Sequence, residues 1–124
     1  MDEIKFRRIV NDLNEYKGVK EVHLLDDKGE LLFNSGDIVL SPKEAINLLD
    51  SWKNKKNAII YNNCRYAMVK NEEIQLAAKN TLDGEGSVVG SVTNEGDYLI
   101  AHIAQETDII LLEWSILVNK LAWS

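Results

Sequence analysis

Apolar side chains recur at helical spacing in three segments of the chain. The first segment, residues 3–17, follows Asp2, which can accept hydrogen bonds at a helix start, and precedes Gly18, which suits the position after a helix end. Its apolar stripe consists of Phe6, Val10, Leu13 and Tyr16. We therefore predict a helix over residues 3–17.

The other two helices have different start signals. Ser41-Pro42-Lys43-Glu44 has the spacing of a capping box, with proline at the first helical position, and predicts a helix that runs to about Lys53. Thr107 can cap a last helix over residues 108–122, which is apolar on nearly all sides. Such a helix is typically buried, so we expect Trp114 and Trp123 in the core.

Strand-like runs separate these helices. Residues 22–25 and 31–33 flank the turn sequence Asp26-Asp27-Lys28-Gly29, and residues 88–93 and 98–104 flank Asn94-Glu95-Gly96-Asp97. Each pair predicts a β-hairpin, and the apolar run Leu99-Ile100-Ala101 indicates a central strand that is covered on both faces. Between the two hairpins, residues 58–61, 66–69 and 74–78 are expected to be strands, although 58–61 could instead extend the second helix.

These elements predict the α+β class with three α/β/α layers. The expected order is α-β-β-α-β-β-β-α, around a central antiparallel sheet of about five strands. A chain of 124 residues without a linker fits a single domain, residues 1–124.

Composition narrows the possible partners and the compartment. The net charge of −6 and the scattered basic residues argue against nucleic acid as a ligand. The single cysteine, Cys64, excludes an internal disulfide and suits a reducing compartment. The N-terminus does not resemble a signal peptide, and the apolar stretch at residues 109–121 is too short and interrupted to span a bilayer. We therefore expect a cytoplasmic protein.

The sequence shows no pattern of catalytic or metal-binding residues. His23, His102 and Cys64 lack the close ligand pairs of zinc sites, and Cys64 has a neighbouring cation, Arg65, but no base nearby in the sequence. The stretch Asp83-Gly84-Glu85-Gly86 lacks the lysine of a phosphate loop and carries acidic residues, so it is interpreted as a hairpin loop. We expect no enzymatic activity, no catalytic residue, no metal and no cofactor.

The second helix has a broad apolar face. Two interpretations remain open for it: packing on the sheet of the same chain, or contact with another chain, since leucine and tryptophan are common interface anchors. The candidate dimer or partner interface consists of Ala45, Leu48, Leu49 and Trp52.

Three stretches of the sequence resemble the roadblock/dynein light-chain family, which has a profilin-like fold. GVKEVHLLDDKGELLFNSG is similar to the first hairpin of that family, SPKEAINLLDSW to its middle helix, and NEGDYLIAHIAQETDIILLEWSILVNKLA to its last strand and closing helix. The resemblance implies a non-enzymatic adaptor that forms a homodimer, or a dimer with a related roadblock-like chain. It also implies a role in scaffolding or regulating a small Ras-like GTPase.

A second hypothesis is a small-ligand sensor, because a sheet and its helices can enclose a ligand. Such a site needs convergent polar groups, and His102 with Tyr98 or Arg65 would supply them.

Overall fold

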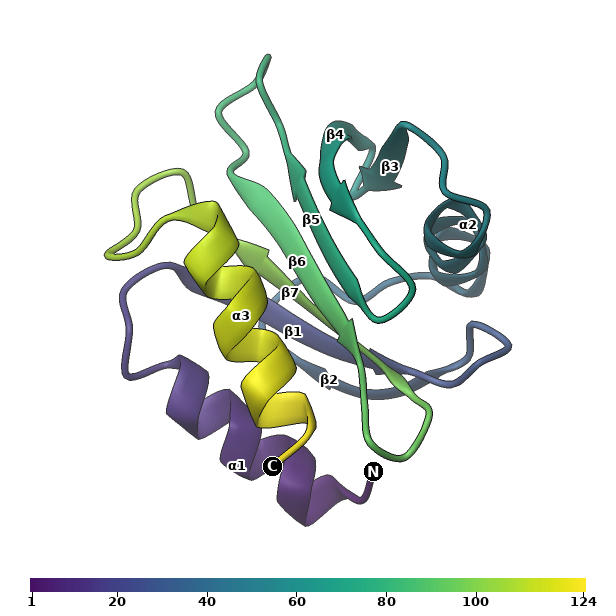
Figure 1. Ribbon diagram of the computed structural model, residues 1–124, viewed down its shortest axis with the longest axis vertical. Coiled ribbons are helices and arrows are strands. Elements are labelled where there is room, and N and C mark those ends of the chain that lie inside the picture. Colours follow the sequence, from purple (N-terminus) through teal and green to yellow (C-terminus); the bar gives the residue numbers. More distant parts are fainter.

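The computed structural model describes residues 1–124 and is built around one sheet of seven strands. From the N-terminus the elements are α1 (Glu3–Leu13), β1 (Val19–Leu25), β2 (Leu31–Ser35), α2 (Pro42–Lys53), β3 (Ala58–Tyr61), β4 (Cys64–Asn71), β5 (Gln75–Lys79), β6 (Ser87–Val92), β7 (Tyr98–Ile103) and α3 (Leu111–Ala122). The strand order is β2-β1-β7-β6-β5-β4-β3, and all neighbours are antiparallel. Helices α1 and α3 lie on one face of the sheet and α2 on the other (Figure 1).

Both predicted hairpins are confirmed, and they join at the centre of the sheet. In the β1–β2 turn, Asp26 Oδ1 accepts hydrogen bonds from the backbone N–H groups of Lys28 and Glu30, each at 2.9 Å. Strand β1 pairs with β7, with Val22 opposite Ala101. Strand β7 therefore lies between β1 and β6 and is buried on both faces, as its apolar run predicted.

The expectation of about five strands is wrong, because the sheet has seven. The strands expected at residues 58–61, 66–69 and 74–78 do form, as β3, β4 and β5, and β3 and β4 are joined as a third hairpin that the expected order of five strands did not include. Its turn, Asn62-Asn63, has left-handed φ values of 49° and 65°, as two-residue hairpin turns require. Helix α2 does not extend into β3, because Lys55 is also left-handed and the Lys56 N–H bonds back to the Ser51 carbonyl, which ends the helix.

The capping box of α2 is confirmed, since the Glu44 N–H donates to Ser41 Oγ at 3.2 Å and the Ser41 N–H donates to Glu44 Oε1 at 3.4 Å. The predicted start of α3 is wrong. This helix begins at Leu111, and the hydroxyl of Thr107 instead donates to the Lys17 carbonyl and accepts from Trp114 Nε1.

Helix α3 is also less buried than its composition predicted. Trp114 is fully buried, as expected, but Trp123 is 48% exposed, so its predicted core position is wrong. Helix α1 is shorter than predicted and ends at Leu13. No helix of this chain combines the length and the apolar character needed to cross a membrane.

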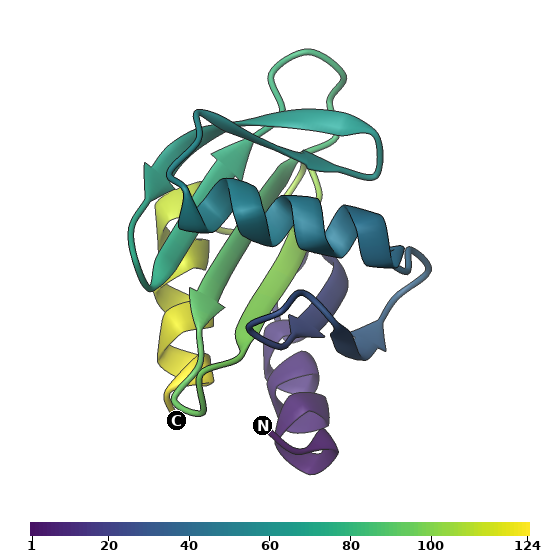
Figure 2. The ribbon, with the colours of Figure 1, turned by 90° about the vertical axis from the view of Figure 1, so that its right-hand side faces the viewer.

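Two apolar cores lie on opposite faces of the sheet. The first contains 14 buried residues and lies between the sheet and helices α1 and α3. The second contains 12 buried residues and lies under α2 and the β3–β4 hairpin. Figure 2 shows α2 lying across its face of the sheet.

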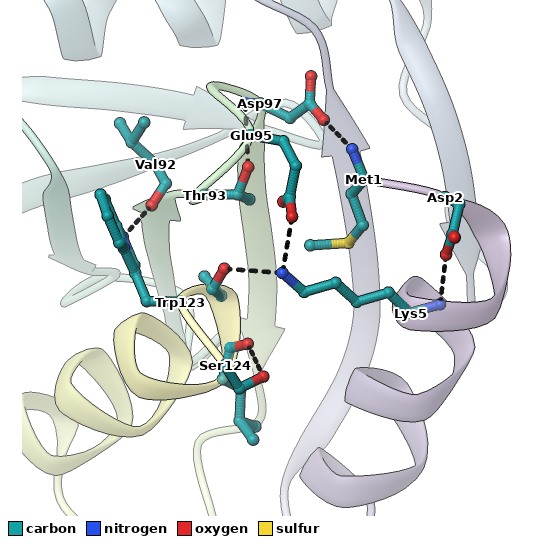
Figure 3. A network of polar contacts seen from close by, with 11 residues as sticks. Met1, Asp2, Lys5, Val92, Thr93, Glu95, Asp97, Trp123 and Ser124 are labelled. Atoms are coloured by element: carbon teal, nitrogen blue, oxygen red, sulfur yellow. Dashed lines mark hydrogen bonds and ion pairs between the residues drawn. The ribbon is translucent and has the colours of Figure 1, made fainter.

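Polar contacts join the first core's helices to the β6–β7 turn (Figure 3). Lys5 Nζ of α1 pairs with Glu95 Oε2 of this turn at 2.9 Å and donates to the Ala122 carbonyl at the end of α3. Trp123 Nε1 donates to the Val92 carbonyl of β6 at 2.8 Å. The end of α3 is thereby attached both to α1 and to the sheet.

Candidate partner-binding surface

Helices α1 and α3 cover only part of their face of the sheet. Helix α1 packs on β1 and β2, whereas α3 packs mainly over β6, with further contacts to β5 and β7. Strands β4 and β3 continue the sheet beyond β5, on the side of α3 that lies away from α1 (Figure 1). Their outer side is therefore left open to solvent.

Strand alternation determines which side chains occupy this outer side. Ile59 and Tyr61 are buried in the core under α2, so Ile60 between them points outward and is 52% exposed. Arg65 lies opposite Ile60 in the β3–β4 ladder and is exposed on the same side. We call this surface the open face, and it consists of Ile60, Arg65, Ala67, Val69 and Lys79.

The open face combines apolar side chains with free positive charge. Val69 lies at a β-bulge and is 55% exposed. Arg65 and Lys79 belong to no ion pair, whereas the nearby Lys70 lies 3.7 Å from Glu72. In an acidic chain, two free cations beside an exposed apolar strip are typical of a surface for a protein partner with acidic groups.

A cavity adjoins the open face at the start of α3. It has a volume of about 330 Å³, and Lys79 and Ser87 of the sheet face Leu111 and Trp114 of the helix across it. The helix start has no side-chain cap, and its N-cap residue, Ile110, is largely exposed. The cavity therefore extends the open face from the strands to the first turn of α3.

Under the β3–β4 hairpin, on the opposite side of the sheet from the open face, lies a set of buried polar side chains that we call the polar cluster. Tyr61 Oη donates to Glu21 Oε1 at 2.9 Å and lies 2.7 Å from His23 Nε2. His102 Nδ1 lies 2.7 Å from the same Glu21 oxygen, and His102 Nε2 lies 3.3 Å from Tyr66 Oη. The members of the polar cluster are Glu21, His23, Tyr61, Tyr66 and His102.

Burial controls the protonation of three groups in the polar cluster. It lowers the pKa of His23 to about 4, because the charged imidazolium loses its hydration. It raises the pKa of Tyr61 and of Tyr66 far above the usual range, so both hydroxyls remain hydrogen-bond donors. The polar cluster is thus a hydrogen-bonded part of the interior rather than an open catalytic site.

His23, His102 and Cys64 are the residues that the sequence analysis weighed as possible metal ligands. The structure places both histidines in the polar cluster, whereas Cys64 lies at the start of β4, opposite Tyr61. No three His, Cys, Asp or Glu side chains are close enough together to hold a metal ion.

The groups proposed for a ligand-sensing site do not converge. His102 is in the polar cluster, Tyr98 lies at the other end of β7 against Trp52, and Arg65 points to the opposite side of the sheet.

The apolar face of α2 packs within the chain. Its four candidate interface residues are almost completely buried: Ala45, Leu48, Leu49 and Trp52. The Trp52 ring lies 5.2 Å from the ring of Tyr98 and packs over Gly90 of β6. A partner could reach these side chains only if α2 left the sheet.

Comparison with known proteins identifies the family. No protein-family model matches the chain, but Loki profilin-3 of Lokiarchaeum sp. (strain GC14_75) is 49% identical over 124 residues, the whole of both chains. The chain belongs to the profilin family. Solved profilins share its fold at lower identity: LokiProfilin2 in a complex with rabbit actin has a TM-score of 0.79 at 18% identity, covering 98% of this chain and 95% of that one.

Two further profilin structures agree with this assignment. LokiProfilin1 gives a TM-score of 0.70 at 22% identity, covering 98% of both chains. Profilin II of Acanthamoeba castellanii gives a TM-score of 0.68 at 19% identity, covering 84% of this chain and 82% of that one.

The predicted membership of the roadblock/dynein light-chain family is therefore wrong. The sequence is that of a profilin over its full length, and two strands more than predicted complete the profilin sheet. The predicted homodimer and the scaffolding of a Ras-like GTPase depended on that resemblance and are overturned with it, since the structural relatives are profilins, two of them solved in complexes with actin.

The sequence did not indicate the open face as a surface, and of its residues only Arg65 was a candidate, for the ligand-sensing site. Ile60 belonged to a run of uncertain type, residues 58–61. The Asn62-Asn63 dipeptide was the available signal, because it marks a two-residue hairpin turn and thereby predicts which side each flanking residue takes.

Proposed function

We propose that this profilin binds one actin molecule through the open face and acts as a non-enzymatic actin regulator in the cytoplasm. The observation that carries the proposal is full-length similarity to a profilin, together with close structural agreement with LokiProfilin2 and LokiProfilin1 from complexes with rabbit actin. The chemistry of the open face supports the choice of surface.

The open face has the features that protein recognition requires. Ile60 and Val69 are apolar and half exposed, and their burial by a partner would be favourable. Arg65 and Lys79 can form new ion pairs without breaking existing ones. Binding through the open face does not require α2 to leave the sheet.

The test is calorimetric titration of rabbit actin monomers with the wild type and with Arg65→Glu. The wild type should form a one-to-one complex. Reversing the charge at Arg65 should weaken binding at least about tenfold, because attraction to an acidic partner becomes repulsion. The matched control is Lys43→Glu, an exposed lysine on the opposite side of the sheet, which should bind like the wild type.

The outcomes separate function from surface. If the wild type does not bind actin, the proposed function is wrong. If the wild type binds but Arg65→Glu and Lys79→Glu bind equally well, another surface contacts actin.

A further inference from the structure

Glu21 and His102 form a buried pair in which the hydrogen-bond acceptors outnumber the available donor protons. Glu21 is 4% exposed and His102 is 2% exposed. His102 Nδ1 lies 2.7 Å from Glu21 Oε1, and His102 Nε2 lies 2.7 Å from the backbone carbonyl oxygen of Glu85. Both ring nitrogens therefore face oxygen atoms at hydrogen-bonding distance.

These contacts require more protons than a carboxylate and a neutral imidazole possess. The Glu85 carbonyl can only accept, so His102 Nε2 must donate to it. The contact between His102 Nδ1 and Glu21 then needs a second proton, on the ring or on the carboxyl group. Tyr61 does not supply it, because its hydroxyl donates its only proton to Glu21 in a separate contact.

The surroundings favour keeping this additional proton. A Glu21 carboxylate and a neutral His102 would leave a buried negative charge, and the lone pairs of His102 Nδ1 and Glu21 Oε1 would face each other at 2.7 Å. No lysine or arginine forms an ion pair with Glu21. The titratable groups that face the pair or its tyrosines come from β1, α2, β3, β4 and the β5–β6 loop: His23, Glu44, Tyr61, Cys64, Tyr66, Asp83 and Glu85.

The contacts of the pair hold two peripheral segments to the sheet centre. Through Tyr61 and Tyr66, it connects the β3–β4 hairpin to β1 and β7. Through the Glu85 carbonyl, it connects the β5–β6 loop to β7. Gly86 keeps this loop close, because a side chain there would meet the Ile103 carbonyl.

We propose that Glu21 and His102 share one bound proton that latches the β3–β4 hairpin and the β5–β6 loop to the sheet, and that rising pH releases this latch. In an open or unfolded state both side chains are hydrated, so the pair does not need to hold the additional proton above neutral pH. The closed state then holds one proton more than the open state. The equilibrium constant for opening therefore rises about tenfold per pH unit above neutrality.

The test is hydrogen exchange of the full chain between pH 7 and pH 9, corrected for intrinsic exchange rates. In the wild type, peptides from residues 58–71 and 80–86 should lose about tenfold in protection per pH unit, while peptides from α3 should not. Glu21→Gln should abolish this slope, because the Gln side chain can donate to a neutral His102. Glu44→Gln, the same exchange in a neighbouring carboxylate, should keep the slope.

A pH-independent wild type, or a Glu21→Gln variant with the wild-type slope, would overturn the proposal. A second measurement does not depend on how the variants fold. NMR of the wild type at pH 7 should show either a doubly protonated His102 ring or a protonated Glu21 carboxyl group. A neutral ring beside an ionised carboxylate would contradict the shared proton.

Discussion

The two faces of the profilin sheet are stabilised in different ways. Under α1 and α3, the first core is apolar, its ion pairs lie at the margin, and the buried polar groups beside it are small hydroxyls such as those of Ser91 and Ser115. Under α2 and the β3–β4 hairpin, the second core adjoins the polar cluster, whose carboxylate, imidazoles and hydroxyls are buried. Apolar burial does not depend on pH, whereas the hydrogen-bonded network depends on every proton in it. We therefore expect size changes to damage the first face most and pH changes the second.

The largest expected effect is on the apolar face. Trp114 of α3 is fully buried and contacts Thr107 and Tyr16. Trp114→Ala should lower the free energy of unfolding by about 4 kcal/mol, because it removes buried apolar surface and leaves a cavity. Urea unfolding at pH 5 and pH 7 should give the same loss. The control is Trp123→Ala, at a half-exposed tryptophan, which should cost about 1 kcal/mol. Equal losses for the two variants would contradict the assigned core.

The second effect belongs to the polar face and depends on pH. Burial lowers the pKa of His23 from 6.5 to about 4, so between these values the unfolded chain binds more protons than the folded one. This contribution is complete above pH 6.5 and is lost as the pH falls toward 4, to a total of about 3 kcal/mol. Urea unfolding from pH 4.5 to pH 7 should show the loss in the wild type and a smaller loss in His23→Gln.

An NMR titration of the His23 ring provides the direct measurement. Titration near pH 6.5 instead of about pH 4 would contradict its assigned burial.

The same two faces differ in how well the sequence predicted them. Local sequence signals were sufficient to predict an element where residues close in the sequence form its hydrogen bonds, as in the capping box at Ser41 and the turn at Asp26. The β3–β4 hairpin lacks an alternating pattern, because β3 has four residues and β4 contains a bulge at Val69. The two runs were expected to be strands, but nothing in the sequence showed that they pair with each other, so the expected order had two strands too few.

The open face and the polar cluster could not be predicted for a related reason. Glu21, Tyr61 and His102 are far apart in the sequence and meet only because β1 pairs with β7 and the β3–β4 hairpin folds over them. The outward direction of Ile60 likewise depends on the register of a strand that the sequence left uncertain. For the apolar face of α2, the sequence identified the residues but not their role, since the composition suits a core and an interface equally well. In the structure these residues are buried within the chain.

The smallest expected effect tests what an unsatisfied polar group costs on the apolar face. The Ser115 hydroxyl of α3 is fully buried and has no hydrogen-bond partner, in contrast to every hydroxyl of the polar cluster. Ser115→Ala should therefore raise the free energy of unfolding by roughly 1 kcal/mol, because it removes the desolvated hydroxyl and improves helix propensity. The matched control is Ser91→Ala, at an equally buried serine whose hydroxyl donates to the Val92 carbonyl and accepts from Asn119 Nδ2. That variant should lose about 1 kcal/mol in urea unfolding. If both substitutions destabilise the protein equally, the Ser115 hydroxyl has a partner, and the distinction between the two faces does not extend to single hydroxyl groups.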